Sequence, residues 1–146
     1  MTESFVCAGS NSSDTVLTIK LPTAPWALSV DASSTAKDVL TLSGDGSSKN
    51  LTVTIGVTAT GKHHTSKQQY SFAIPAAATE FELRLLVDEI ILEAFVAKGL
   101  AAGTSGLKTL DAGGAALSIR ATSGSVLVET AEAWAMGCAY PSGGIA

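Results

Sequence analysis

The most apolar part of the chain covers residues 80–99, and two kinds of element fit it. Its leucines, alanines and charged residues are good helix formers. Against a helix, apolar side chains recur at every second position of residues 81–87, which is the period of a strand with one half-exposed face. Asp88 and Glu89 then interrupt the pattern. The alternation favours a hairpin of residues 81–87 and 90–96, with the helix as the alternative.

Short segments of the same character occupy most of the remaining sequence. They are residues 15–21, 26–30, 38–42, 51–57, 69–74, 107–110, 116–121 and 126–136. Gly, Pro, Asp and Ser separate them, and residues 99–106 are small enough to predict a loop. Regular short strands are typical of a sandwich. We expect an all-β chain of two stacked antiparallel sheets with about ten or eleven strands, a jelly-roll or concanavalin-like β-sandwich. Residues 1–140 would form one domain and residues 141–146 a flexible tail.

Two groups of residues carry a recognisable motif. They are residues 83–88 with residues 93–95, Gly99 and Thr104-Ser105, and residues 132–136 with Ala139-Tyr140. Both groups resemble the hairpin and the closing strand in the C-terminal β-sandwich module of glycoside hydrolase family 32, which contains invertases, levanases and inulinases. Glu89, Ile90 and Gly106 stand where that family usually has Arg, Ser and Arg.

The resemblance implies a role without catalysis. Glycoside hydrolysis needs two carboxyl groups flanking the scissile bond, and in this family they lie on a separate propeller, in motifs such as N-D-P-N-G that are absent here. The resemblance therefore implies a non-catalytic module of a β-fructofuranosidase type protein, not an enzyme on its own. Its partner would be a catalytic propeller domain or a fructose-containing carbohydrate. The alternatives are a stand-alone fructan-binding module and a self-associating structural or surface domain.

Five side chains are candidates for sugar binding: Asp88, Glu93, Arg84, Trp134 and Tyr140. Carboxylates and guanidinium groups form strong hydrogen bonds, and an aromatic ring offers an apolar face. Glu93 shares strand parity with Ile91 and Phe95, so it should lie beside an aromatic ring. Other roles compete with sugar binding for three of these side chains. Trp134 and Phe95 are expected to belong to the core. Arg84 could instead form a structural ion pair with Glu82 or with a residue of a neighbouring strand.

Other chemistry has less support in the sequence. Asp88 and Glu89 at a turn are typical of a solvated tip rather than of a catalytic pair. Adjacent residues such as His63 and His64 point to opposite faces of a strand, so we expect no metal site and no cofactor. Cys7 and Cys138 lie near opposite ends of the chain, and a disulfide between them competes with two buried free thiols.

Composition narrows the class of partner. The net charge is −4, the isoelectric point is about 5.0, and 15% of residues are charged, without a Lys/Arg cluster. We therefore expect no nucleic-acid partner and, without eighteen consecutive apolar residues, no membrane span. The first residues do not read as a signal peptide, yet acceptor triplets at Asn11 and Asn50 favour an extracellular or secretory location. A mean hydropathy of +0.33 suggests an apolar face that packs against another domain.

Overall fold

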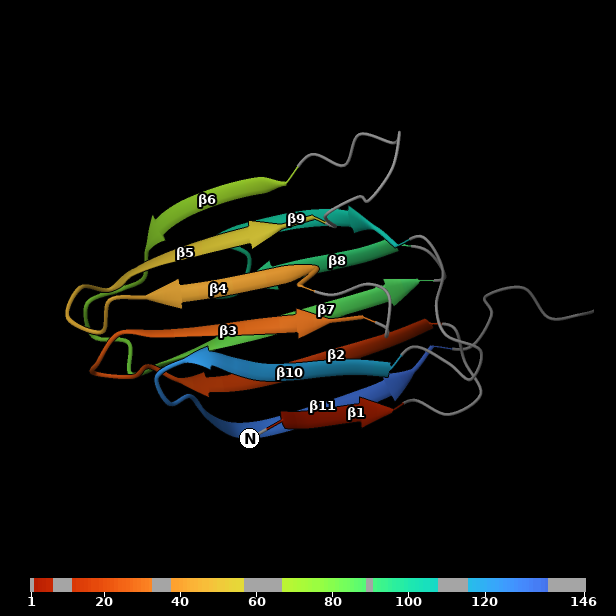
Figure 1. Ribbon diagram of the computed structural model, residues 1–146, viewed down its shortest axis with the longest axis horizontal. Coiled ribbons are helices and arrows are strands. Elements are labelled where there is room, and N and C mark those ends of the chain that lie inside the picture. Colours follow the sequence, from red (N-terminus) through yellow and green to blue (C-terminus); the bar gives the residue numbers. More distant parts are fainter. Residues whose placement is uncertain are drawn as a thin grey trace, which may run out of the picture.

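The computed structural model describes residues 2–6, 12–32, 38–56, 67–88, 91–107 and 116–136. These residues form eleven strands and no helix (Figure 1). The strands are β1 (Thr2–Val6), β2 (Ser12–Lys20), β3 (Trp26–Asp31), β4 (Leu40–Gly44), β5 (Asn50–Ile55), β6 (Gln68–Ala73), β7 (Glu80–Asp88), β8 (Ile91–Val96), β9 (Ala101–Gly106), β10 (Ala116–Ser123) and β11 (Leu127–Ala135). The predicted tail, residues 141–146, lies outside the described residues.

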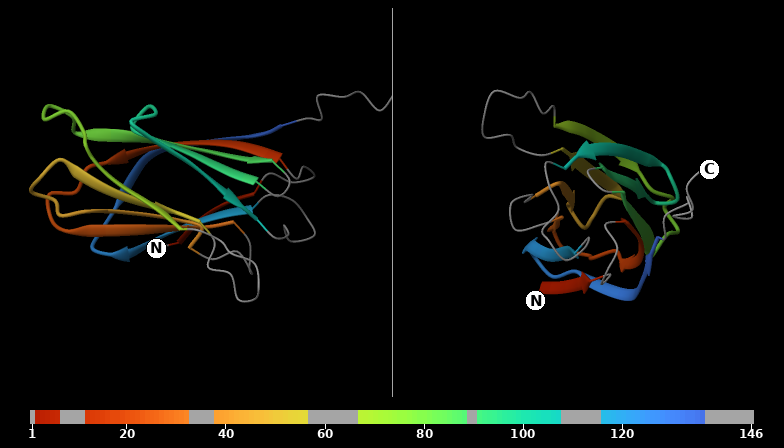
Figure 2. Two further views of the ribbon diagram at one scale, coloured as in Figure 1. Left: turned by 90° about the horizontal axis from the view of Figure 1, so that it is seen from above. Right: turned by 90° about the vertical axis from the view of Figure 1, so that its right-hand side faces the viewer.

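Two antiparallel sheets stack face to face, as the two layers in Figure 2 show. Sheet A has six strands in the order β1-β10-β3-β4-β5-β6, and sheet B has five in the order β11-β2-β7-β8-β9. Every strand pairs antiparallel with its neighbours. The predicted all-β sandwich is confirmed.

The core lies between the sheets and consists mainly of leucine, isoleucine and valine. Leu28 and Leu42 face inward from sheet A, and Leu17, Leu83 and Leu85 face them from sheet B, each at most 1% exposed. The strands supply these residues at every second position, because successive side chains of a strand point to opposite faces. Each sheet therefore has one buried face and one outer face.

The predicted hairpin is confirmed, and the helical alternative for the same stretch is wrong. β7 and β8 pair along their length, from Leu83 with Val96 to Asp88 with Ile91. Helix propensity in this segment is overridden because alternation allows all four inward side chains of β7 to be buried at once. The hairpin lies near the middle of sheet B, where β7 also pairs with β2.

Two parts of the prediction differ from the structure at the sheet edges. Residues 99–106 were expected to form a loop, but Ala101–Gly106 is strand β9. Its small residues are suited to a close approach between the sheets, since a Cβ added at Gly103 would lie 2.6 Å from Ile55 Cγ2. β1 was not predicted; it is one of the two edge strands of sheet A and pairs with β10. β1 depends on pairing with a distant segment, whereas β9 pairs with the preceding strand β8 and was missed because its small residues carry little strand pattern.

Candidate binding faces

The hairpin residues singled out in the sequence lie on the outer face of sheet B. Arg84 and Asp88 occupy outward positions of β7, and Glu93 occupies one of β8. Trp134 of β11 lies opposite Asp14 of β2, another outward position. The structure thus brings four of the five predicted side chains onto one surface.

Arg84 forms the main ion pair on this surface. Its Nε and Nη2 donate to the two carboxylate oxygens of Asp14, at 3.0 and 2.6 Å. This hydrogen bonding to Asp14, together with the charge of the carboxylate, raises the pKa of Arg84 above its ordinary value. The sequence analysis allowed for a structural pair to a neighbouring strand, but it did not identify Asp14, which precedes the predicted strand. The two-point geometry fixes the guanidinium plane against the sheet.

The prediction that Trp134 and Phe95 belong to the core is wrong. Trp134 is 49% exposed, because β11 is an edge strand and this position faces outward. Phe95 pairs with Arg84 across the hairpin, so its ring also lies on the outer face, half-buried among its neighbours. The surface therefore offers two aromatic side chains rather than one.

The carboxylates near the end of the hairpin where Asp88 pairs with Ile91 have different surroundings. Glu93 is exposed and shares its face with Ile91 and Phe95, as strand parity predicted. Asp88 accepts a hydrogen bond of 2.8 Å from the Ser12 hydroxyl, so it is anchored to β2 rather than being a free turn tip. Carboxylates in such positions can accept hydrogen bonds from hydroxyl groups or pair with cations.

A second ion pair lies at the other end of the same face. Lys20 Nζ is 2.6 Å from Glu129 Oε1, at the irregularity that interrupts the pairing of β11 with β2. The hydrogen bond from Lys20 lowers the pKa of Glu129, and a further hydrogen bond with Glu80 acts in the same direction. The bond to Glu129 likewise raises the pKa of Lys20. Both basic side chains of this face are therefore engaged with carboxylates.

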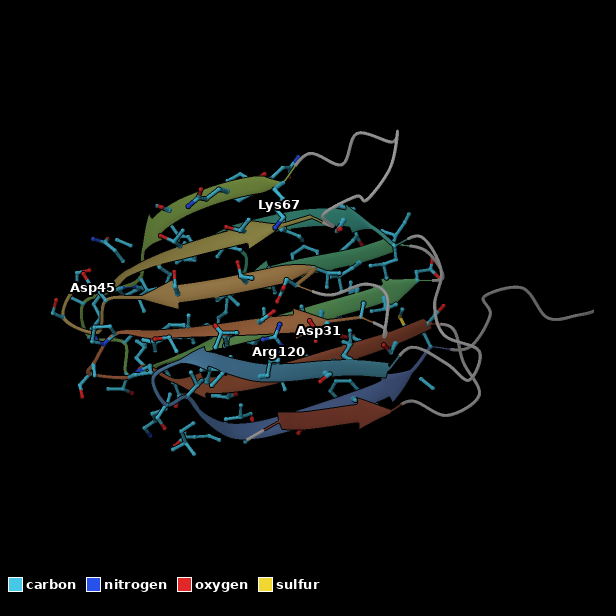
Figure 3. The ribbon with its side chains drawn as sticks, in the orientation of Figure 1. Asp31, Asp45, Lys67 and Arg120 are labelled. Atoms are coloured by element: carbon cyan, nitrogen blue, oxygen red, sulfur yellow. The ribbon has the colours of Figure 1, made fainter. Side chains whose placement is uncertain are left out.

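The outer face of sheet A holds a different polar cluster, which the sequence did not predict. Arg120 of β10 reaches Asp31 of β3 at 3.4 Å and Asp38 at 2.5 Å (Figure 3). Asp38 also accepts from the Ser29 hydroxyl at 2.5 Å and donates its backbone N–H to Asp31 at 2.8 Å. Asp31 is 4% exposed, so its charge depends on these partners. The cluster joins β3, β10 and residue 38, which has a positive φ of 49°.

A turn beyond this cluster is held by Asp45. Its carboxylate accepts from the backbone N–H groups of Ser47 and Ser48, at 3.1 and 2.8 Å, and from the Ser48 hydroxyl at 2.8 Å. These hydrogen bonds, chiefly those from Ser48, lower the pKa of Asp45. The turn borders an open polar cleft of about 370 Å³ that Asn50 and Thr52 also line. The cleft is open to solvent, and most of its lining residues are polar.

Several predicted positions lie outside the described residues: Tyr140, Cys7, Cys138, His63, His64 and Glu89. The disulfide and the fifth sugar-binding candidate therefore stay predictions. Within the described part of the chain, no three His, Cys, Asp or Glu side chains are grouped as a metal ion would require. No helix there is long and apolar enough to cross a membrane.

Fold and surface together define a two-sheet β-sandwich whose outer faces carry polar side chains. The chain belongs to the family described as "Glycosyl hydrolases family 32 C terminal", whose model matches residues 5–135. The matched model describes the C-terminal part of the proteins of that family. The comparison with curated proteins found no match.

Solved structures share this fold at low sequence identity. A fructofuranosidase from Schwanniomyces occidentalis, complexed with fructose, matches with a TM-score of 0.58 and 13% identity over 91% of this chain. The match covers 30% of the fructofuranosidase, so this chain corresponds to less than a third of that protein. Xenopus laevis galectin-Ib matches with a TM-score of 0.57 and 8% identity over 92% of this chain and 100% of the galectin. The Caenorhabditis elegans galectin LEC-6 matches with a TM-score of 0.55 and 17% identity, covering 90% and 89% of the two chains.

Proposed function

We propose that this chain is the β-sandwich module of a fructan- or sucrose-hydrolysing protein and that it supports a catalytic propeller domain. The observation that carries the proposal is the family match over residues 5–135. The small share of the Schwanniomyces protein that the match covers agrees with a supporting module beside a larger catalytic part. A rigid sandwich can stabilise such a partner by binding its folded state and not its unfolded state.

The surface best suited to that contact is the outer face of sheet B. It carries three of the exposed large apolar side chains, Ile91, Leu127 and Trp134, which are 43%, 59% and 49% exposed. Their presence agrees with the apolar face expected from the mean hydropathy. Tryptophan is among the residues that contribute most to protein–protein interfaces.

A second candidate function is the binding of fructose-containing carbohydrate on the same face. The observation that favours it is the gathering of Arg84, Asp88, Glu93 and Trp134 on one surface, with Phe95 beside Glu93. The ring face of Trp134 would lie against one sugar residue of a fructan chain, while Glu93, three strands away, accepts hydrogen bonds from the hydroxyls of another. The Arg84–Asp14 pair would supply a fixed group between them.

One calorimetric series tests both functions on the full chain. The titrants are levan, inulin, sucrose, fructose and the Schwanniomyces catalytic domain produced without its own sandwich. We expect saturable binding of the catalytic domain and a higher midpoint of its thermal unfolding. Sugar binding that is lost in Glu93→Ala and kept in Asp45→Ala would establish the second function, because Asp45 lies at a turn of sheet A. Flat traces with all five titrants would contradict both functions.

We also propose an extracellular or secretory location. The supporting feature is the acceptor triplet that begins at Asn50, whose side chain is exposed at the start of β5. Expression behind a yeast secretion signal should give a glycosidase-sensitive increase in mass that Asn50→Gln reduces. A secreted product without attached glycan at Asn50 would remove this support.

A further inference from the structure

A pocket of about 250 Å³ lies at one end of the sandwich, between the β6–β7 connection and the turn that joins β8 to β9 (Figure 1). Ile74 and Phe81 line it and are each 4% exposed, and two lining alanines, Ala78 and Ala97, pack against the core. An engineered apolar cavity of about 150 Å³ in another protein holds one benzene molecule. The pocket therefore has room for a single small apolar group. Its other lining residues are Pro75, Glu80, Glu82, Lys98 and Leu100.

Hydrogen bonds and ring stacking hold the pocket in shape. The Ala78 N–H donates to the Pro75 carbonyl at 2.9 Å, and Lys49 Nζ donates to the Ala78 carbonyl at 2.8 Å. The Phe81 ring stacks on Trp26, with the ring centroids 5.9 Å apart. A ligand that enters such a preformed pocket does not have to order its walls, which lowers the free-energy cost of binding.

The turn on one side of the pocket has a strained backbone. Ala97 and Lys98 have positive φ angles of 50° and 57°, and Gly99 follows with 86°. Turns with consecutive positive φ angles normally use Asn, Asp or Gly, because most other residues are strained there. The Ala97 N–H donates to the Glu82 carbonyl at 2.7 Å and so ties the turn to β7. Strained residues concentrate at ligand-binding sites, and Ala97 and Lys98 both line the pocket, so the strain indicates a ligand independently of the pocket's volume.

The charged side chains of the pocket favour a cation. Glu82 is half-buried, and within the described part of the chain no hydrogen bond or ion pair engages its carboxylate. Arg84, two residues along the same face, is bonded to Asp14 instead. With Glu80 and Lys98, the lining carries two carboxylates and one ammonium group, a net charge of −1. A half-buried carboxylate attracts a cation more strongly than a carboxylate in bulk water does, because the effective dielectric constant is lower.

We propose that this pocket, the turn pocket, binds a small apolar molecule that carries one ammonium group. The apolar part would lie against Ile74 and Phe81, and the ammonium group would pair with Glu82. A pocket that is mostly apolar and has a few polar or charged groups is the usual form of a small-molecule site. A neutral sugar fits less well, since its hydroxyl groups would lose hydrogen bonds to water against these apolar side chains. The inference does not depend on the proposed function and adds a site at the end of the sandwich.

Probes of similar size and different charge test the turn pocket: 2-phenylethylamine, 2-phenylethanol and phenylacetate, titrated into the isotope-labelled full chain. Amide NMR shifts report which residues each probe reaches. We expect 2-phenylethylamine to shift residues 74–82 and 97–100 saturably and to bind about fivefold more tightly than the alcohol, the upper end for an ion pair near the surface. Phenylacetate should bind least. Glu82→Gln should remove the preference for the amine, whereas Glu132→Gln, which also removes a carboxylate from sheet B but lies outside the pocket, should keep it.

Two substitutions of Lys98 test the strained turn. Lys98→Ala keeps the strain and Lys98→Gly relieves it, while both remove the ammonium group that repels a cationic ligand. We expect Lys98→Ala to bind the amine more tightly than the wild type does. Lys98→Gly should unfold at a higher urea concentration than Lys98→Ala but bind the amine more weakly, because a relaxed turn no longer fixes the wall of the pocket.

Each result bears on one part of the inference. The turn pocket is ruled out as a ligand site if none of the probes shifts its residues, or if the shifts gather around Trp134 on the outer face instead. Equal affinity for all the probes, unchanged in Glu82→Gln, would overturn the choice of a cationic ligand. Equal amine affinity in the two Lys98 variants would overturn the role of the strained turn. Circular dichroism of each variant confirms that the fold is kept.

Discussion

Replacing Leu85 by alanine is expected to lower the free energy of unfolding by about 2–5 kcal/mol, the range for leucine-to-alanine changes in protein cores. Leu85 is fully buried, and its side chain lies between the sheets, on β7. β7 is flanked by β2 and β8, so little backbone freedom is available for the core to collapse around the lost methyl groups. The loss combines transfer free energy with the cost of the residual cavity.

Leu86→Ala is the matched control, since the same substitution is made one residue along the same strand. Leu86 points to the outer face and is half-buried, so we expect a cost of about 1 kcal/mol or less. Urea denaturation followed by circular dichroism measures both values, with equal denaturant slopes expected if the unfolded states are alike. Equal losses in the two variants would show that the alternation of β7 is misassigned, because strand register decides which leucine is buried.

Arg120→Ala is expected to have the next largest effect, a loss of about 2–4 kcal/mol, toward the lower part of the range for breaking a buried ion pair. The substitution leaves the buried carboxylate of Asp31 without its guanidinium and removes the bond to Asp38. The side chain of Arg120 is 37% exposed, so water would compensate part of the loss. The effect arises from a buried carboxylate that loses its charged partner, rather than from lost packing.

The companion variant Arg120→Lys distinguishes charge from geometry. Lysine keeps the positive charge but lacks the planar fork that reaches Asp31 and Asp38 together. We therefore expect Arg120→Lys to lower the free energy of unfolding, but by less than Arg120→Ala does. The measurement is again the free energy of unfolding in urea. If Arg120→Lys lowers the free energy of unfolding as much as Arg120→Ala does, the geometry of the bridge matters and the charge alone does not. If Arg120→Ala does not lower it, the other partners of Asp31 are sufficient without Arg120.

The sequence predicted those strands in which the alternation of apolar and polar residues is complete within a single segment. Alternation, together with the turn residues that interrupt it, located the hairpin of β7 and β8 and the strands near Leu17, Leu28 and Leu42. The same alternation placed Glu93 correctly beside Phe95. Local periodicity is enough here because a strand with one buried face must repeat every two residues.

The parts that were missed depend on pairing between segments far apart in the chain. Trp134 is exposed because its strand ends sheet B, and Asp14 meets Arg84 only through the register of β2 with β7. Arg120 meets Asp31 in the same way, across β10 and β3. Neither residue of such a pair carries a local signal of the other.

The order in which the strands pair has a consequence for synthesis of the protein. β2 lies between β7 and β11, and Ser13 pairs with Ala135; β1 finds its neighbour in β10. Within the sandwich, the first two strands to be synthesised must therefore wait for the last two before both sheets are complete. Folds rich in such distant contacts form slowly, and their unpaired strand edges are exposed to aggregation in the meantime. A chain cut short before β10 would leave both β1 and one edge of β2 unpaired, so the sandwich is assembled only after its last two strands have been synthesised.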